Sequence, residues 1–232
     1  MGKRRDKEFG DNVHFQKKAP PILEPQNQQQ SEYMHSIRTV PYTIATGYAG
    51  TGKTYIPVRM ACDFYQNKDI RKIVLARPAV SQSKSLGFFK GTKEEKMQNW
   101  LAPIWSTLLE VFSESKLMTM IEYNELEFVP LETIKGNSWK DSFIIIDEAE
   151  DCTLKELKSI LTRLGTNSTM VLCGDIGQAD LRNSGLSQLL SLMEKNNRLG
   201  RMIDHHAFDD ADDIVRSEAC KEIILGFEET GN

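Results

Sequence analysis

The chain has 232 residues, of which 40% are apolar and 27% are charged, with a formal net charge of −4. This composition excludes a wholly disordered chain, and at roughly 150 residues per domain the length predicts one large domain with extensions. Because no run of about 18 apolar residues occurs and no apolar segment follows the basic start, we expect a cytoplasmic protein without a membrane partner.

The first residues differ from the rest of the chain in composition. Prolines at positions 20, 21 and 25 exclude a continuous helix, so we expect a flexible N-terminal arm over residues 1–24. Apolar residues at helical spacing then predict a short helix from about Gln28 to Arg38. We expect one α/β domain over residues 25–226 and a short C-terminal tail over residues 227–232.

From Tyr42 onward, short β-branched runs alternate with longer amphipathic stretches, which is typical of strand–helix units around a parallel sheet. We expect strands over residues 42–46, 72–77, 126–131, 143–147, 170–174 and 201–206. We expect further helices over residues 53–66, 92–112, 153–163, 185–195 and 217–225. The continuous apolar run at 143–146 suits a strand that is buried on both faces. The predicted fold is therefore α/β, a doubly wound and mainly parallel sheet flanked by helices.

Residues 47–54 carry the most specific pattern in the chain, between the first strand and the next helix. They read Gly47-Tyr48-Ala49-Gly50-Thr51-Gly52-Lys53-Thr54, which fits G-x-x-x-x-G-K-[ST]. The glycines let successive backbone N–H groups face phosphates at the helix N-terminus. We expect Lys53 to contact the β- and γ-phosphates of ATP and Thr54 to bind Mg²⁺. A helix that started near Gly52 would place Pro57 just beyond its first turn, so we expect a bend or a later start.

Two further patterns lie at the ends of predicted strands. The strand at 143–147 ends in Asp147 and is followed by Glu148. We expect Asp147 to hold Mg²⁺ and Glu148 to polarise an attacking water molecule. Downstream, Gln178 closes a G-D-x-x-Q pattern after another apolar run, and its amide can sense the γ-phosphate and its water because it both donates and accepts. These residues favour magnesium-dependent hydrolysis of ATP.

Together these residues resemble the PhoH family, which comprises P-loop ATPases of bacteria and phages. The resemblance spans residues 25–225 and extends beyond the ATPase motifs. It includes Ala76-Arg77-Pro78-Ala79-Val80, Leu86-Gly87-Phe88, Leu161-Thr162-Arg163-Leu164-Gly165 and Ser184-Gly185-Leu186. It implies a RecA-like P-loop NTPase fold, similar to the first RecA-like domain of superfamily 1 helicases. It also implies a helicase-like ATP hydrolase of the cytoplasm, or of the host cytoplasm for a phage protein.

The resemblance also assigns two residues outside the ATPase motifs. Gln30 matches a glutamine that reads adenine in helicases, although glutamines at 26, 28 and 29 leave the register open. Arg216 matches an arginine of the family's closing segment. Since the chain has no second RecA-like domain, the arginine that completes the site comes from its own C-terminal segment or from a neighbouring copy, with Arg163 and Arg182 as further candidates. We therefore expect a homo-oligomer, for which a ring and a hexamer are candidate forms.

The partner that the resemblance implies is RNA or single-stranded nucleic acid. Arg77 and the segment after it would lie at the carboxyl ends of the strands, where contacts to phosphates and bases belong. One position and one segment depart from the family pattern: Glu150 stands where glutamine is usual, and residues 134–138 carry fewer positive charges. The acidic net charge also gives no support to a broad nucleic-acid-binding surface.

The predicted function is Mg²⁺-dependent binding and hydrolysis of ATP, coupled to remodelling or unwinding of RNA or single-stranded nucleic acid. One alternative is an ATP-gated assembly or regulatory protein with little turnover. A second alternative is a small-molecule kinase that uses the same phosphate loop. The coupling to nucleic acid rests on the resemblance, because a fold shared with helicases does not by itself identify a substrate.

Overall fold

The computed structural model of the chain describes residues 20–78, 102–131, 138–179 and 184–230. Its centre is a six-stranded sheet with the strand order β3-β2-β4-β5-β1-β6. The strands are β1 (Tyr42–Gly47), β2 (Lys72–Arg77), β3 (Leu126–Pro130), β4 (Ser142–Ile146), β5 (Thr169–Cys173) and β6 (Ile203–Phe208). Every neighbouring pair is parallel, which confirms the predicted α/β fold with a mainly parallel, doubly wound sheet.

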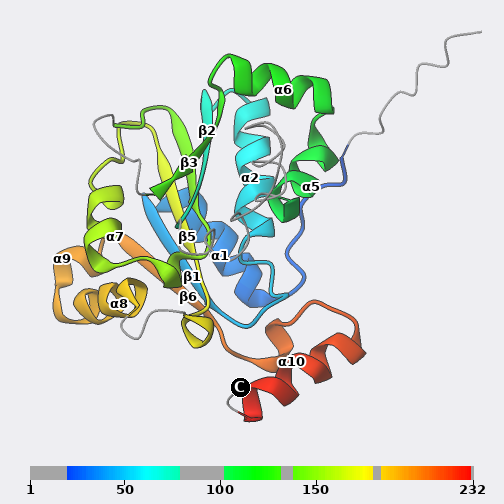
Figure 1. Cartoon of the computed structure of the whole chain (residues 1–232), viewed down its shortest axis with the longest axis vertical. Helices are drawn as coiled ribbons and strands as arrows, with labels where there is room; N and C mark the ends of the chain where they lie inside the picture. The colour runs from blue at the N-terminus through cyan, green and yellow to red at the C-terminus, as the bar shows by residue number, and fades with distance from the viewer. Residues whose placement is uncertain (1–19, 79–101, 132–137, 180–183, 231–232) are drawn as a thin grey trace, which may run out of the picture.

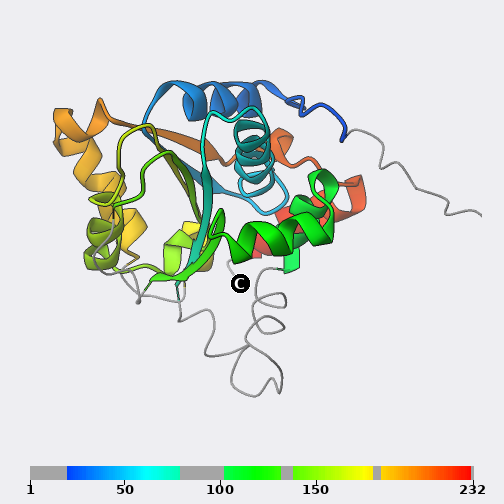
Figure 2. The ribbon, with the colours of Figure 1, turned by 90° about the horizontal axis from the view of Figure 1, so that it is seen from above.

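Helices cover both faces of this sheet (Figure 1). Figure 2 shows the same two layers from above, with the sheet between them. The helices on one face are α1 (Gln28–Thr39), α2 (Tyr55–Gln66), α5 (Ala102–Val111) and α6 (Glu114–Glu122), and those on the other are α7 (Leu154–Leu161) and α8 (Gly185–Lys195). The short α9 (Asn197–Gly200) follows α8, and α10 (Glu218–Thr230) lies apart from the sheet. Within the described ranges, no helix combines the length and the apolar character that a membrane crossing needs.

Alternate residues of the central strands pack into two separate apolar cores. In β4, Phe143 and Ile145 contribute to the core under α1, α2, α5 and α6, whereas Ile144 and Ile146 contribute to the core under α7 and α8. This burial on both faces explains why β4 is a continuous apolar run rather than an alternating pattern. Because β4, β5 and β1 are neighbours, the loops that follow them meet at the carboxyl edge of the sheet.

Some element boundaries differ from the prediction for local reasons. Helix α2 begins at Tyr55, so Pro57 lies within the first turn, where a missing N–H is tolerated. This confirms the later helix start. Strand β6 begins two residues later than predicted because residues 201–202 form a turn after α9. The sequence patterns did not predict α6, which Ser113 caps by accepting a hydrogen bond from the backbone N–H of Lys116.

Several predicted features fall outside the described residues. They are residues 1–19 of the arm, 92–101 of the long helix, 134–137 of the weakly basic segment, Arg182, and residues 231–232 of the tail. In the described part, residues 20–25 contain no helix, and α10 extends to Thr230. The segment that follows Arg77 in the nucleic-acid hypothesis also lies outside, from residue 79 to residue 101.

Candidate functional site

The loop between β1 and α2 has a backbone conformation that depends on its glycines. The φ angles are +111° at Gly47, +78° at Gly50 and +89° at Gly52, which side-chain-bearing residues rarely adopt. A Cβ at Gly47 would also lie 2.3 Å from the carbonyl oxygen of Phe208 in β6. These positions therefore require glycine for conformational reasons and, at Gly47, for steric reasons as well.

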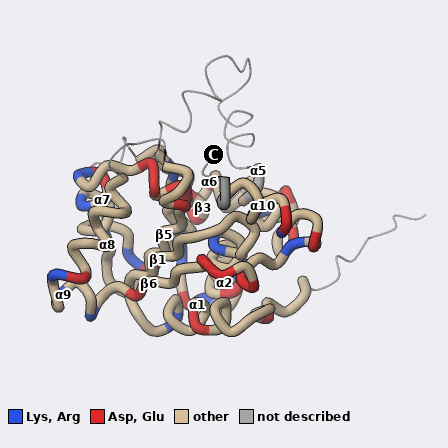
Figure 3. The backbone as a smooth tube through the Cα atoms, turned by 90° about the horizontal axis from the view of Figure 1, so that it is seen from below, with Lys and Arg blue, Asp and Glu red and all other residues tan. Residues whose placement is uncertain are grey.

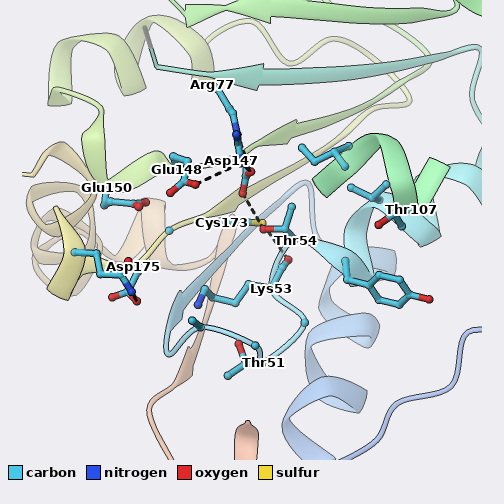
Figure 4. A pocket seen from close by; sticks show the side chains of 18 of the residues that line it. Thr51, Lys53, Thr54, Arg77, Thr107, Asp147, Glu148, Glu150, Cys173 and Asp175 are labelled. Atoms are coloured by element: carbon cyan, nitrogen blue, oxygen red, sulfur yellow. Dashed lines mark hydrogen bonds and ion pairs between the residues drawn. The ribbon is translucent and has the colours of Figure 1, made fainter. Parts of the chain in front are cut away.

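Lys53 closes the loop and turns back over it (Figure 4). Its Nζ donates hydrogen bonds to the carbonyl oxygens of Gly47 and Tyr48, the second at 2.5 Å. Burial lowers the pKa of the Lys53 ammonium, and the carboxylate of Asp175 is the strongest of the charges that oppose this effect. A phosphate group in the loop would compete with the two carbonyls for this ammonium.

Helix α1 holds the rear of the loop through two side chains of one face. Gln30 Nε2 donates to the carbonyl oxygen of Thr51 at 3.0 Å, and Gln30 Oε1 accepts from the backbone N–H of Gln26 at 2.8 Å. Tyr33 Oη donates to the carbonyl oxygen of Lys53 at 2.9 Å. Both side chains are buried, Gln30 to 3% exposure and Tyr33 to 0%. Two carbonyls of the loop are thereby turned toward α1.

Pro57 explains why the carbonyl oxygen of Lys53 needs these partners. In a regular helix this carbonyl would accept from the backbone N–H four residues later, but residue 57 is proline and has none. Its neighbours keep the ordinary pattern, because Ile56 N–H donates to Gly52 O and Val58 N–H donates to Thr54 O. Cys173 Sγ, at the end of β5, donates to Lys53 O at 3.1 Å beside Tyr33. Sequence reasoning missed both donors, and Pro57 was the local signal for them.

The carboxylate of Asp147 lies directly after β4 and is almost fully buried, at 5% exposure of the residue. Its Oδ1 accepts a hydrogen bond from Thr54 Oγ1 at 2.8 Å, across 93 positions of sequence. Its Oδ2 accepts from Arg77 Nε at 2.8 Å and also from Arg77 Nη2. Arg77 ends β2, the strand beside β4, so the sheet itself brings this arginine to the carboxylate.

Glu148 has a backbone conformation that non-glycine residues seldom adopt. Its φ of 55° and ψ of 43° lie in the left-handed region, which carries an energetic cost for a residue with a side chain. Arg77 Nη2 lies 3.3 Å from Glu148 Oε1, so one guanidinium contacts both carboxylates. Sequence reasoning assigned Arg77 to nucleic acid, and only the pairing of β2 with β4 reveals this contact.

A cavity of about 690 Å³ joins the loop to these carboxylates. Of the sequence-predicted site residues, its lining includes Ala49, Gly50, Thr51, Gly52, Lys53, Thr54, Asp147, Glu148, Gln178 and Arg216. Gln30, Gly47 and Tyr48 are not part of the lining. The lining also includes Arg77, Glu150 and Asp175, which the sequence did not predict for the ATP site. One cavity therefore collects residues from the ends of four strands.

Gln178 and Arg216 reach this cavity from different elements. Gln178 ends the short η3 turn (Ile176–Gln178), and its Nε2 donates to Asp175 Oδ2 at 2.8 Å. Arg216 lies over the loop of its own chain, because a Cβ at Gly50 would be 2.7 Å from Arg216 Cγ. The backbone N–H of Val215 also donates to Gly50 O at 3.1 Å. By contrast, Arg163 is not in the cavity lining.

Thr54 and Asp147 are the residues that could hold Mg²⁺. They present a hydroxyl and a carboxylate oxygen 2.8 Å apart, and oxygen ligands are what this hard cation prefers. Elsewhere in the described ranges, no group of three or more His, Cys, Asp or Glu side chains is arranged to bind a metal. A small set of protein ligands fits Mg²⁺, which usually keeps several water molecules and shares its remaining ligands with phosphates.

Comparison with known proteins identifies relatives of most of the chain. The model of the family "PhoH-like protein" matches residues 22–228. A PhoH-like protein of Synechocystis is 31% identical over 207 residues, which cover 88% of this chain and 62% of that one. A PhoH-like protein of Bacillus subtilis is 34% identical over 202 residues, with 86% and 62% coverage. Protein PhoH of Escherichia coli is 32% identical over 212 residues, with 89% and 58% coverage.

The chain spans less than two thirds of the length of these relatives. Among solved structures, the Sulfolobus solfataricus SWI2/SNF2 ATPase core in complex with dsDNA matches with a TM-score of 0.44 at 15% identity. That match covers 83% of this chain and 46% of the other.

Proposed function

The chain belongs to the PhoH-like protein family, and on that premise we propose that it binds ATP with Mg²⁺ and hydrolyses it in the cavity at the phosphate loop. One observation carries this proposal. The same cavity contains the loop of residues 49–54 and the carboxylates of Asp147 and Glu148. A loop that only bound a phosphate would not need two carboxylates in the same cavity.

The cavity residues that the sequence predicted have distinct tasks in this proposal. The loop N–H groups and Lys53 bind the phosphates, while Thr54 and Asp147 hold the metal ion. The bound Mg²⁺ would offset negative charge on the phosphates. Glu148 orients and polarises the attacking water, and its left-handed backbone directs the carboxylate beside Arg77. Gln178, which lines the cavity, contacts that water or the γ-phosphate.

Arg216 is the arginine that we assign to the phosphates. It lies against Gly50 of its own chain, so a second copy is not required to supply this charge. An arginine that neutralises the transition state contributes about 10³–10⁵ in rate in related chemistry. The homo-oligomeric ring stays a prediction of the sequence, to be measured independently.

Contact between Gln30 and adenine also stays a prediction. The Gln30 amide uses one N–H and its oxygen on backbone groups of Thr51 and Gln26. One N–H and one oxygen lone pair of the amide are left for a base. Gln30 therefore has a loop-holding role whichever residue reads the adenine.

We further propose that hydrolysis is coupled to remodelling of RNA or single-stranded nucleic acid. The support is the resemblance of the core to helicases. Lys and Arg are interspersed with Asp and Glu in the view of Figure 3, so binding would use local contacts rather than a broad basic face. A small-molecule kinase and an ATP-gated assembly protein are the competing functions.

The deciding experiment is the steady-state ATPase rate of the full chain with Mg²⁺ or EDTA, with and without single-stranded RNA. Lys53→Ala is expected to abolish ATP binding. Glu148→Gln is expected to keep ATP binding and to lower turnover on the order of 100-fold or more. RNA stimulation would support nucleic-acid coupling. ADP formation only with an added acceptor would support the kinase.

Matched controls separate site effects from general ones. Lys155→Ala on α7 and Glu122→Gln on α6 make the same changes at exposed positions outside the cavity. Both should hydrolyse ATP at the wild-type rate. A wild-type rate in Glu148→Gln would refute the role of Glu148, and tight ATP binding with no turnover in the wild type would favour the assembly protein.

A further inference from the structure

Glu150 is an ionisable residue that the proposed mechanism does not use. It lies in η2 (Ala149–Asp151), a short turn directly after Glu148, and only 3% of it is exposed. It lines the same cavity as the phosphate loop. By resemblance to the family this position would be glutamine, a neutral side chain that can donate a hydrogen bond. An ionised glutamate cannot donate one.

The carboxyl of Glu150 packs against the backbone at Gly174. A Cβ at Gly174 would lie 2.6 Å from Glu150 Oε2, so the carboxyl fills the space beside that glycine. Ser184 Oγ donates to the backbone carbonyl of Glu150 at 2.7 Å and not to its carboxyl. Within the described residues, Glu150 Oε2 is buried and accepts no hydrogen bond. An ionised carboxylate in this place would be poorly solvated.

The carboxyls of Glu148 and Glu150 interact, and together with burial this interaction raises the pKa of Glu150. Figure 4 shows both carboxyls at one side of the cavity. Two ionised carboxylates are acceptors only, so a hydrogen bond between these neighbouring carboxyls requires one of them to carry a proton. The Glu148 side chain is 42% exposed and lies 3.3 Å from Arg77 Nη2, so water and a cation stabilise its charge. Burial therefore favours the proton on Glu150 rather than on Glu148.

The surroundings of Glu150 agree with this assignment. Burial, followed by the interaction with Glu148, raises the pKa of Glu150 to about 9. Backbone N–H groups of Glu150 and Asp175 oppose the shift. Lys53 is the cation that faces this carboxyl from the phosphate loop, and the Asp175 carboxylate lines the same cavity. The ionisable residues of α8, which packs against η2, are exposed in its last turn.

We propose, resting on the ATPase function above, that Glu150 is a positioning residue whose protonated carboxyl donates a hydrogen bond to Glu148 and directs that carboxylate at the attacking water. Arg77 Nη2 donates to Glu148 Oε1 at 3.3 Å, so the carboxylate is fixed between a cation and a neutral acid. A glutamine amide would donate the same hydrogen bond through Nε2. Glutamate differs in one respect, because it loses its donor and gains a repelling charge when the pH rises.

The test is the pH dependence of kcat for ATP at saturating Mg²⁺ in wild type, Glu150→Ala and Glu150→Gln. Glu150→Ala is expected to lower kcat on the order of 10- to 100-fold with little change in KM, because Glu148 is misdirected. Glu150→Gln is expected to rescue the neutral-pH rate. Wild-type kcat should fall above a pH of about 9, and this fall should be missing in Glu150→Gln. The same alkaline fall in both proteins would overturn the proposal.

A second measurement does not depend on catalysis. A protonated carboxyl has its own infrared C=O band, so the wild-type minus Glu150→Gln difference spectrum should contain that band at neutral pH and lose it above a pH of about 9. The pH dependence of thermal stability is a third measurement, and the proposal fixes its direction. The folded chain holds a proton that the unfolded chain releases at neutral pH, so wild-type stability falls as pH rises and Glu150→Gln should be at least as stable.

The outcomes separate this proposal from the function beneath it. If the infrared band is missing, Glu150 is ionised and the proposal fails even when the protein hydrolyses ATP. If the band is present but wild type has no ATPase activity, the proposed function fails and the positioning role fails with it, although the proton assignment stands. If Glu150→Gln folds yet remains as slow as Glu150→Ala, the hydrogen bond is not the reason for the loss.

Discussion

The two sides of the phosphate loop are built in different ways. Behind the loop, Gln30 and Tyr33 are buried, uncharged and hydrogen-bonded to loop carbonyls. In front of it, the carboxylates of Asp147 and Glu148 share one guanidinium, that of Arg77. The rear is therefore complete within the chain, whereas the front carries charges that suit a cation and phosphates. The residues behind the phosphate loop therefore fix its backbone conformation, whereas the residues in front of it supply the charged groups for the reaction.

This division predicts how substitutions on each side should fail. A change behind the loop alters the backbone that binds phosphate, so ATP affinity and the free energy of unfolding should fall together. A change in front leaves the loop intact, so turnover should fall while binding survives. The largest effect is expected in front, because charged groups act there on the reacting phosphate.

Asp147→Asn is the substitution in front of the loop for which we expect the largest loss of turnover. It removes the charge that pairs with Arg77 and that would hold Mg²⁺ with Thr54. We expect kcat to fall on the order of 100-fold and the Mg²⁺ concentration for half-maximal rate to rise. The measurement is the ATPase rate across a Mg²⁺ titration, with ATP affinity measured separately.

Asp141→Asn is the matched control for that substitution. Asp141 lies just before β4, at the opposite end of the strand from Asp147, and accepts a hydrogen bond from Asn167 Nδ2 at 2.9 Å. It does not line the cavity, so its Mg²⁺ titration should match wild type. If Asp147→Asn has the Mg²⁺ requirement of the wild type, Asp147 does not bind the metal ion. The proposed difference between the front and the rear of the loop would then be wrong.

The sequence predicted the front of the site better than the rear. The apolar run directly before Asp147 and Glu148 predicts both a buried strand and the position at which that strand ends. The contact of Arg77 with those carboxylates was not predictable, because it depends on which strand lies beside β4. Tyr33 and Cys173 look like ordinary core residues at their positions. Their polar atoms gain a role only where three separate elements meet.

The order of the elements was predictable, whereas short helices were not. Alternation of β-branched and amphipathic stretches indicates a parallel sheet because only strands buried on both faces lose their polar alternation. Helix α6 has nine residues and follows α5 after a turn of two residues. The separation of α5 from α6 depends on Ser113, whose side chain caps the start of α6. The spacing of apolar residues alone does not reveal this start.

Tyr33→Phe tests the rear with a smaller expected effect. It removes the O–H donor to Lys53 O and leaves Cys173 as that carbonyl's remaining side-chain donor among the described residues. We expect a loss of about 1 kcal/mol in the free energy of unfolding and a several-fold weaker ATP affinity. Chemical denaturation and equilibrium ATP binding measure the two quantities.

Tyr42→Phe is the control that sharpens this result. Tyr42 Oη also donates to a backbone carbonyl, that of Leu161, at 2.7 Å, but it lies at the amino end of β1. The same chemical change should therefore lower stability without weakening ATP binding. If both variants bind ATP as wild type does, the rear contacts serve stability alone and the proposed coupling of loop conformation to affinity is wrong.

The smallest expected effect is the coupling between Tyr33 and Cys173. Each donates to the same oxygen, Lys53 O, which Pro57 deprives of its usual helical partner. Either single change, Tyr33→Phe or Cys173→Ala, leaves one donor in place. The double variant leaves the carbonyl without either, so its stability loss should exceed the sum of the single losses by about 0.5–1 kcal/mol. Strict additivity in this double-mutant cycle would mean that water or a loop movement satisfies the carbonyl, and that the rear is less rigid than its buried hydrogen bonds indicate.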